Sequence, residues 1–210
     1  MRETDLQSGA VIVTGGSGFV GASVIKQLVR AQRDVHLVLR PGASLWRIRD
    51  VIDQTTVHQV DIQDMERLLQ TFRKVRPVAA IHLATYGAYA DQASPRIALE
   101  TNVMGSFNVF EAAIETEVEL VVNVGSSSEY GTKLHPMSEH DPVSPDRMYG
   151  VAKVAQSLMS AVLGRRGERR AHQSATEYDG FRACRPSTYP KHDDCHSEDP
   201  RTGLSATRKD

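Results

Sequence analysis

The stretch Thr-Gly-Gly-Ser-Gly-Phe-Val-Gly at residues 14–21 decides the expected fold of this chain. It ends a β-branched run and opens a helical pattern, so we expect a strand, a tight turn and a helix in succession. Gly15 permits the turn, Gly18 lets the backbone approach a pyrophosphate, and Gly21 allows the helix to pack close to the sheet. The free N–H groups and positive dipole end of the helix favour an anion here. The stretch therefore predicts a dinucleotide-binding turn.

Short β-branched runs and helical patterns alternate on both sides of this turn. Strands are expected over residues 10–14, 35–39, 56–60, 79–83 and 120–124. Helices are expected over residues 18–31, 64–73, 96–117 and 148–163. Strands that are apolar on both faces and alternate with helices are typical of a parallel sheet covered on both sides. We therefore predict an α/β fold, a Rossmann-like doubly wound parallel sheet.

The composition changes sharply near Gly164. From that residue to Asp210 the chain has no Val, Ile, Met or Trp, only one Leu, and 18 charged residues among 47. Such a segment buries too little apolar surface to offset an ordering cost of about 1 to 2 kcal/mol per residue. We expect residues 1–163 to form the Rossmann-like domain and residues 164–210 to be a polar, disordered tail.

Charge and cysteine content exclude several kinds of partner. The formal charge is −1, from 25 Lys and Arg against 26 Asp and Glu, so no global field marks a nucleic-acid or membrane partner. No apolar run approaches the roughly 20 residues of a membrane helix, and the first residues lack a signal-peptide core. Cys184 and Cys195 are too few for a disulfide framework and are not spaced as a zinc site. We expect a cytoplasmic chain without a metal site.

The ends of the later strands carry candidate cofactor contacts. The second strand ends at Arg40 instead of the acid that accepts from a ribose hydroxyl, which favours the 2′-phosphate of NADP over NAD. The alternative is that Arg40 is only a solvated residue at the end of the strand. Asp61 is a candidate partner of the adenine amino group, and Ile62 of the adenine ring. The small Ala84 would let the backbone pass the cofactor ribose, whereas His82 is expected to be an internal histidine and not a catalyst.

A tyrosine and a lysine on the last predicted helix carry the expected chemistry. Tyr149 and Lys153 are four residues apart and therefore share one helix face. A free tyrosine has a pKa near 10, and a neighbouring ammonium group favours its ionised form. Tyr149 is thus a candidate acid or base. A serine from residues 126–128 would hold the substrate oxygen while the proton moves.

Taken together, these motifs resemble the extended short-chain dehydrogenase/reductase family, specifically its NAD-dependent epimerase/dehydratase branch of nucleotide-sugar enzymes. The resemblance covers residues 10–163. The motifs that carry it, in chain order, are Thr-Gly-Gly-Ser-Gly-Phe-Val-Gly, His-Leu-Ala, Asn-Val-Met-Gly at residues 102–105, Ser-Ser-Ser-Glu-Tyr-Gly at residues 126–131, and Tyr-x-x-x-Lys. The resemblance implies Tyr149 as catalytic acid/base and Lys153 as its partner and ribose ligand. It places the catalytic serine at Ser126, or at Ser127 if the alignment contains a gap.

The same resemblance implies a cofactor site for NADP or NAD and a nucleotide-sugar substrate. The implied cofactor contacts are Gly15, Ser17, Gly18, Phe19, Val20, Gly21, Arg40, Asp61, Ile62, Leu83, Ala84, Thr85, Asn102, Tyr149 and Lys153.

The branch contains reductases, epimerases and dehydratases. Dehydratases carry an acidic residue just after the catalytic Thr, where this chain has Ser127 and Ser128; Glu129 fills that role only with a gap. The Gly-Ser-Ser-x-Glu-Tyr-Gly form, together with Arg40, is more similar to reductases of 4-keto-6-deoxy nucleotide sugars. Epimerase and dehydratase activities stay open.

The chain departs from this branch after Leu163, where family members continue with a buried strand and a small substrate domain. The polar sequence found there is typical of a truncated C-terminus. A second hypothesis is therefore a catalytically impaired, cofactor-binding fragment that lacks the substrate pocket. Without the segments that follow in family members, apolar surface on the last helix and one flank of the sheet would be uncovered. Such surface favours association, so a homodimer is a candidate state of this chain.

Overall fold

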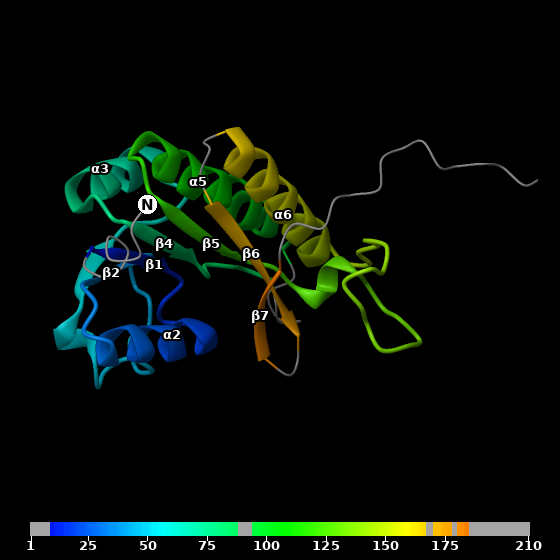
Figure 1. Ribbon diagram of the computed structural model, residues 1–210, viewed down its shortest axis with the longest axis horizontal. Coiled ribbons are helices and arrows are strands. Elements are labelled where there is room, and N and C mark those ends of the chain that lie inside the picture. The colour runs from blue at the N-terminus through cyan, green and yellow to red at the C-terminus, as the bar shows by residue number, and fades with distance from the viewer. Residues whose placement is uncertain (1–8, 88–93, 167–169, 178–179, 185–210) are drawn as a thin grey trace, which may run out of the picture.

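The computed structural model describes residues 9–87, 94–166, 170–177 and 180–184 of the 210-residue chain. Within these residues the chain forms one seven-stranded sheet with helices on both faces (Figure 1). The strands are β1 (Val11–Thr14), β2 (Val35–Leu39), β3 (Thr56–Gln59), β4 (Ala79–His82), β5 (Leu120–Val124), β6 (Arg170–Glu177) and β7 (Gly180–Cys184). The five strands predicted from the sequence are confirmed, each with ends within one residue of those expected.

The strand order is β3-β2-β1-β4-β5-β6-β7, and every neighbouring pair is parallel except β6 with β7. The chain starts in the middle of the sheet, builds outward through β2 and β3, and then crosses to the other side of β1. This order is that of a doubly wound fold, whose ligand crevice lies at the carboxyl ends of the strands where the winding direction reverses. The predicted fold class is confirmed.

Helices cover the two faces unequally. The helical segments are α2 (Phe19–Arg30), η1 (Ile52–Gln54), α3 (Met65–Val75), α4 (Pro95–Leu99), η2 (Glu100–Gly105), α5 (Ser106–Glu115), η3 (Ser127–Glu129) and α6 (Met148–Arg166). Figure 1 shows α2 on one face and α3, α5 and α6 together on the other. The single helix predicted over residues 96–117 is instead three segments, because η2 is a π-helical turn between two α-helices.

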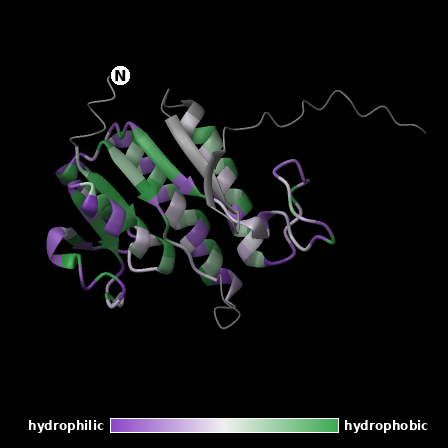
Figure 2. Cartoon of the chain, turned by 60° about the horizontal axis from the view of Figure 1, so that its bottom comes forward, coloured by the Kyte–Doolittle hydropathy of each residue, from purple (hydrophilic) through white to green (hydrophobic). Residues whose placement is uncertain are grey.

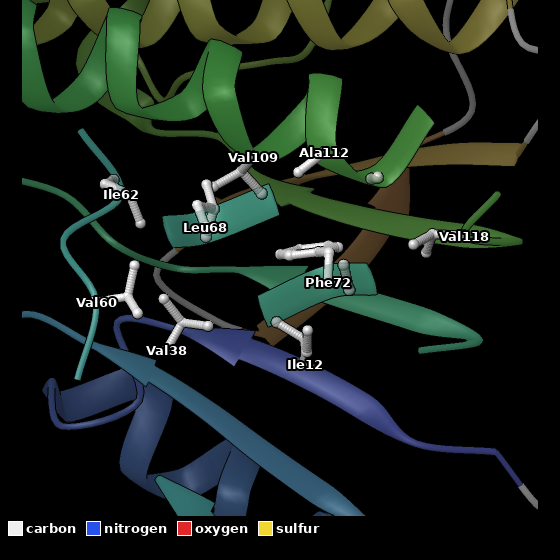
Figure 3. Packing of buried hydrophobic residues seen from close by; sticks show 11 residues of the cluster. Ile12, Val38, Val60, Ile62, Leu68, Phe72, Val109, Ala112 and Val118 are labelled. Carbon is white, nitrogen blue, oxygen red and sulfur yellow. The ribbon is translucent and has the colours of Figure 1, made fainter. Parts of the chain in front are cut away.

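Alternate residues of β1 supply two separate cores. Ile12 packs with Phe72 and Val109 beneath α3 and α5 (Figure 3), whereas Val11 and Val13 face the α2 side of the sheet. Successive strand residues point to opposite faces, so a strand that is apolar at every position is buried on both. Figure 2 shows hydrophobic residues concentrated along the central strands. None of the helices in the described ranges is long and apolar enough to cross a membrane.

The chain after residue 163 differs from the predicted tail. Helix α6 continues to Arg166, and β6 and β7 extend the sheet beyond β5. Strand pairing joins main-chain groups, so a polar sequence can lengthen a sheet without contributing to its apolar core. Composition therefore does not reveal these two strands. Residues 185–210 of the predicted tail lie outside the described residues.

The core is tested by removing its largest fully buried side chain. Phe72 has no exposed surface, and Phe72→Ala should lower the free energy of unfolding by about 3 to 5 kcal/mol. Phe19 is 75% exposed, so Phe19→Ala should change it by less than about 0.5 kcal/mol. Urea unfolding followed by circular dichroism measures both. Equal losses in the two variants would contradict this assignment of the core.

Candidate dinucleotide and catalytic site

The glycine turn after β1 packs backbone against backbone. Gly15 has a φ of +68°, and a Cβ atom there would lie 2.5 Å from both the nitrogen of Ala84 and the carbonyl carbon of Leu83. The nitrogen of Gly18 donates to the carbonyl of Gly15 at 3.0 Å and closes the turn. A Cβ on Gly21 would overlap that same carbonyl. Side chains at Gly15 and Gly21 are excluded. At Gly15 this agrees with the expected tight turn, whereas Gly21 packs against the turn itself and not against a strand.

The first turn of α2 offers its backbone donors without a side-chain cap. Gly18 occupies the N-cap position, no side chain bonds to the exposed N–H groups, and the first turn holds no acidic residue. Phe19 points outward, while Ser17 and Val20 are half-buried. The unpaired N–H groups and the positive end of the helix dipole make this turn suitable for an anionic group.

The segment after β4 lies directly against the glycine turn. Both Leu83 and Ala84 donate their backbone N–H to the Thr14 hydroxyl at 3.2 Å. At the other end of the segment, Asn102 accepts from the nitrogen of Tyr86 at 2.8 Å and donates to its carbonyl at 2.7 Å. Asn102 also accepts from the Thr85 hydroxyl and is fully buried. Its amide is thus engaged by the segment itself, so any effect on a cofactor acts through that segment.

A buried histidine links these two anchors. His82 Nδ1 lies 2.6 Å from the Thr14 hydroxyl, and His82 Nε2 lies 2.8 Å from the Ser106 hydroxyl. The Ser106 hydroxyl donates to the main-chain carbonyl of Asn102 at 2.6 Å. Burial lowers the pKa of His82 to about 3, and the charge of Lys153 acts in the same direction. The expectation of an internal histidine is confirmed.

The residues expected around the adenosine half lie at the ends of β2 and β3. Arg40 is exposed, and its guanidinium makes no hydrogen bond or ion pair with any described residue. Asp61 is half-buried and accepts from the nitrogen of Gln63 at 2.9 Å. Ile62 is only 6% exposed and packs on Gly105, where a Cβ would lie 2.7 Å from its side chain. Ile62 therefore belongs to the core and leaves little surface for a ring.

The serine segment after β5 folds as a capped single turn, η3. Ser126 accepts from the nitrogen of Ser128 at 3.2 Å, and Glu129 accepts from the nitrogen of Ser126 at 2.8 Å. Glu129 thus has a structural role in this turn, whereas the sequence motif suggests only a catalytic acid at this position. The Ser-x-x-Glu spacing of a capping box was the available signal. Ser126 is buried and held at two points, whereas Ser127 is exposed.

Lys153 is buried beside this turn. Its Nζ donates to the carbonyl of Val124 and to the side chain of Gln156, both at 2.6 Å. Burial lowers the pKa of Lys153 to about 8, against the opposing charge of Glu129. Two of its three N–H bonds are thereby used, and the third stays available. Tyr149 is half-buried one turn earlier on α6, and its hydroxyl has no partner among the described residues.

Strand register brings these groups to one edge of the sheet. Thr14 pairs with His82, and His82 pairs with Asn123, so β1, β4 and β5 end side by side. The glycine turn, the segment after β4 and the serine turn therefore share the crevice expected in doubly wound sheets.

A glycine turn at the switch point of such a sheet, with a serine, tyrosine and lysine beside it, defines a Rossmann-type α/β protein. Residues 11–172 match the NAD dependent epimerase/dehydratase family, and the chain belongs to that family. The resemblance found in the sequence is confirmed at this level.

The named relatives include a dehydratase and epimerases. The dTDP-glucose 4,6-dehydratase of Neisseria gonorrhoeae is 30% identical over 165 residues, covering 69% of this chain and 47% of the relative. The UDP-glucose 4-epimerase of Lactobacillus helveticus is 29% identical, covering 72% and 46%. The UDP-glucose 4-epimerase of Brucella ovis, solved in complex with NAD, is 26% identical with a TM-score of 0.71, covering 80% and 51%. The chain spans about half the length of these relatives.

Titration of His82 should be visible in the stability of the protein. Its folded-state pKa of about 3 lies below the ordinary 6.5, so the unfolded state binds more protons between these values. The free energy of unfolding should therefore fall as pH drops below 6.5, by up to about 1.4 kcal/mol per pH unit from this group. His82→Gln should remove that part of the slope in urea unfolding at pH 4 to 7. The exposed His140→Gln is the control, and parallel curves for wild type and His82→Gln would contradict the prediction.

Proposed function

We propose that the chain binds a nicotinamide dinucleotide along the carboxyl edge of its sheet, with the pyrophosphate at the glycine turn. The observation that carries this proposal is the close packing of Gly15 against Ala84 beside an uncapped helix start. The packing of Gly15 against Ala84 leaves room only for main-chain atoms, and the uncapped start of α2 supplies unpaired N–H groups for phosphate oxygens.

We propose NADP as the preferred cofactor. The exposed Arg40 at the end of β2 has no carboxylate partner among the described residues and is free to meet a 2′-phosphate. NAD, which the Brucella ovis epimerase structure contains, is the alternative. Arg40 distinguishes the two because a 2′-phosphate gains a charge-assisted bond that a 2′-hydroxyl does not.

The proposed reaction is hydride transfer on a nucleotide sugar, with Tyr149 as the acid/base. The nicotinamide supplies the hydride chemistry, and the side chains of this chain move and hold the proton. Tyr149 has a free hydroxyl and lies one helical turn from Lys153, whose ammonium balances negative charge on the phenol oxygen. Ser126 accepts a bond from Ser128 but keeps its own proton for a substrate oxygen.

Reduction of a 4-keto-6-deoxy nucleotide sugar is the reaction that we favour. The positions after Ser126 are Ser127 and Ser128, and the nearby Glu129 is buried and engaged in the capping box of η3. No carboxylate therefore stands at the positions that a dehydratase uses to eliminate water. Burial raises the pKa of Glu129, which further separates it from a freely ionised surface acid.

A second candidate function is cofactor binding without turnover. It is supported by the extent of the match, because the chain spans about half of its named relatives. The glycine turn, Asp61 and Lys153 all lie within the matched part. Orientation of reactants is worth roughly 7 to 11 kcal/mol of a reaction barrier, so binding can persist where turnover does not.

Cofactor choice is tested by exchanging the charge at Arg40. NADP should bind more tightly than NAD, and Arg40→Asp should weaken NADP by about ten- to a hundredfold, since one charge-assisted bond is worth about 1.5 to 3 kcal/mol. Arg30→Asp makes the same change of net charge at the far end of α2 and should leave the preference intact. Isothermal titration calorimetry measures both cofactors. Equal affinities, unaffected by Arg40→Asp, would refute the NADP assignment.

Catalysis is tested by single-atom changes in the serine, tyrosine and lysine group. Tyr149→Phe should leave dinucleotide affinity within about twofold and lower reduction of a 4-keto nucleotide sugar by about 100- to 10,000-fold. In the same assay at 340 nm, Ser126→Ala should lower turnover while Ser127→Ala leaves it unchanged. Saturable binding with no turnover in the parent chain would instead support the second candidate.

A further inference from the structure

We propose that His82 is a positioning residue for the dinucleotide site, because it joins the two anchors that hold residues 83–86 against the glycine turn. This inference rests on the proposed function, since it concerns how the same site is kept in shape. His82 has no exposed surface and reaches no ligand itself. Its effect runs through Thr14 on one side and Ser106 on the other.

The donor and acceptor roles in this series of hydrogen bonds follow from its last acceptor, the main-chain carbonyl of Asn102. Ser106 donates its only hydroxyl proton to the Asn102 carbonyl, so His82 Nε2 must carry a proton and donate it to the Ser106 oxygen. His82 Nδ1 is then an acceptor and receives the Thr14 proton. Thr14 Oγ1 in turn accepts from Leu83 N. Every group in the series therefore has one compatible role, and histidine must be neutral to fill its place.

Together, these hydrogen bonds form a closed network around residues 83–86, which we call the circuit; its members are Thr14, His82, Ser106 and Asn102. Thr14 holds Leu83 and Ala84 at the start of the segment, and Asn102 holds Tyr86 at its end. His82 and Ser106 connect those anchors beneath the segment. Ser106 begins α5 directly after the π-helical turn η2, and π-helical turns occur frequently at functional sites. The circuit thus ties the segment to two strands and a helix.

The position of the segment matters because Gly15 already touches it. With no space between the Gly15 Cα and the Leu83–Ala84 peptide, a shift of the segment changes the turn that would hold the pyrophosphate. The strand order also places the residues expected around the two halves of the dinucleotide on opposite sides of β1. Arg40 and Asp61 follow β2 and β3 on one side of β1, whereas the segment and Ser126 follow β4 and β5 on the other. The circuit therefore acts on the nicotinamide half.

Affinity for the whole ligand compared with its adenosine half tests the proposal. Thr14→Val and His82→Leu should weaken NADP at least tenfold while changing affinity for adenosine 2′,5′-bisphosphate less than twofold, and NAD against AMP should show the same contrast. Thr14→Ser, which keeps the hydroxyl, should bind like the wild type. Thr116→Val removes another buried hydroxyl, at the C-cap of α5 and at the far end of that helix from Ser106, and is the matched control. Equal weakening of both ligands, or of neither, would overturn the proposal.

Hydrogen exchange gives a second readout that needs no ligand. Ser106→Ala removes hydrogen bonds of the circuit in which Leu83 and Ala84 take no part. If the circuit holds the segment, amide exchange at Leu83 and Ala84 should nevertheless accelerate at least tenfold. Thr116→Val should leave the exchange of both amides unchanged. Acceleration without any dinucleotide binding by the wild type would refute the proposed function and uphold the circuit. Unchanged exchange in Ser106→Ala would overturn the circuit even if NADP binds.

Discussion

The contact between Gly15 and the Leu83–Ala84 peptide is the constraint on which the rest of the site depends. A Cβ atom at Gly15 would lie 2.5 Å from two main-chain atoms, which neither segment can accommodate without moving. The contact requires β1 and β4 to be neighbours in register, with Thr14 opposite His82. Because parallel strands in register end at one edge, this packing also brings the serine turn after β5 to the same crevice.

Beneath that edge two buried bases, His82 and Lys153, are each held by fixed polar partners. His82 is neutral and bonded at both ring nitrogens, since an isolated imidazolium would be strongly disfavoured there. Lys153 instead carries its proton between the Val124 carbonyl and Gln156, with the Glu129 carboxyl contributing the opposite charge. One buried base is thus held uncharged, whereas the other is stabilised in its charged form one helical turn from Tyr149.

The sequence predicted the parts of the fold that depend on apolar periodicity and glycine geometry. The five inner strands and the turn at Gly15 are of this kind, because each leaves a local mark on residue type. The π-helical turn at residues 100–105 is not, since the helical pattern continues through it. Strands β6 and β7 were also missed, because main-chain pairing at a sheet edge does not require apolar residues. In the site, the motif identified Asn102 but not its bonds to Tyr86, which depend on tertiary packing.

The choice between the two candidate serines shows how local structure refines a motif. Spacing alone leaves Ser126 and Ser127 nearly equivalent, since one gap exchanges them. In the structure Ser126 is the N-cap of η3, where its N–H donates to Glu129 and its oxygen accepts from Ser128. These bonds fix the hydroxyl while leaving its proton unused, and a donor that is already fixed loses little entropy when it meets a substrate oxygen. Ser127 is exposed and lies outside this pair of cap bonds, so the geometry favours Ser126.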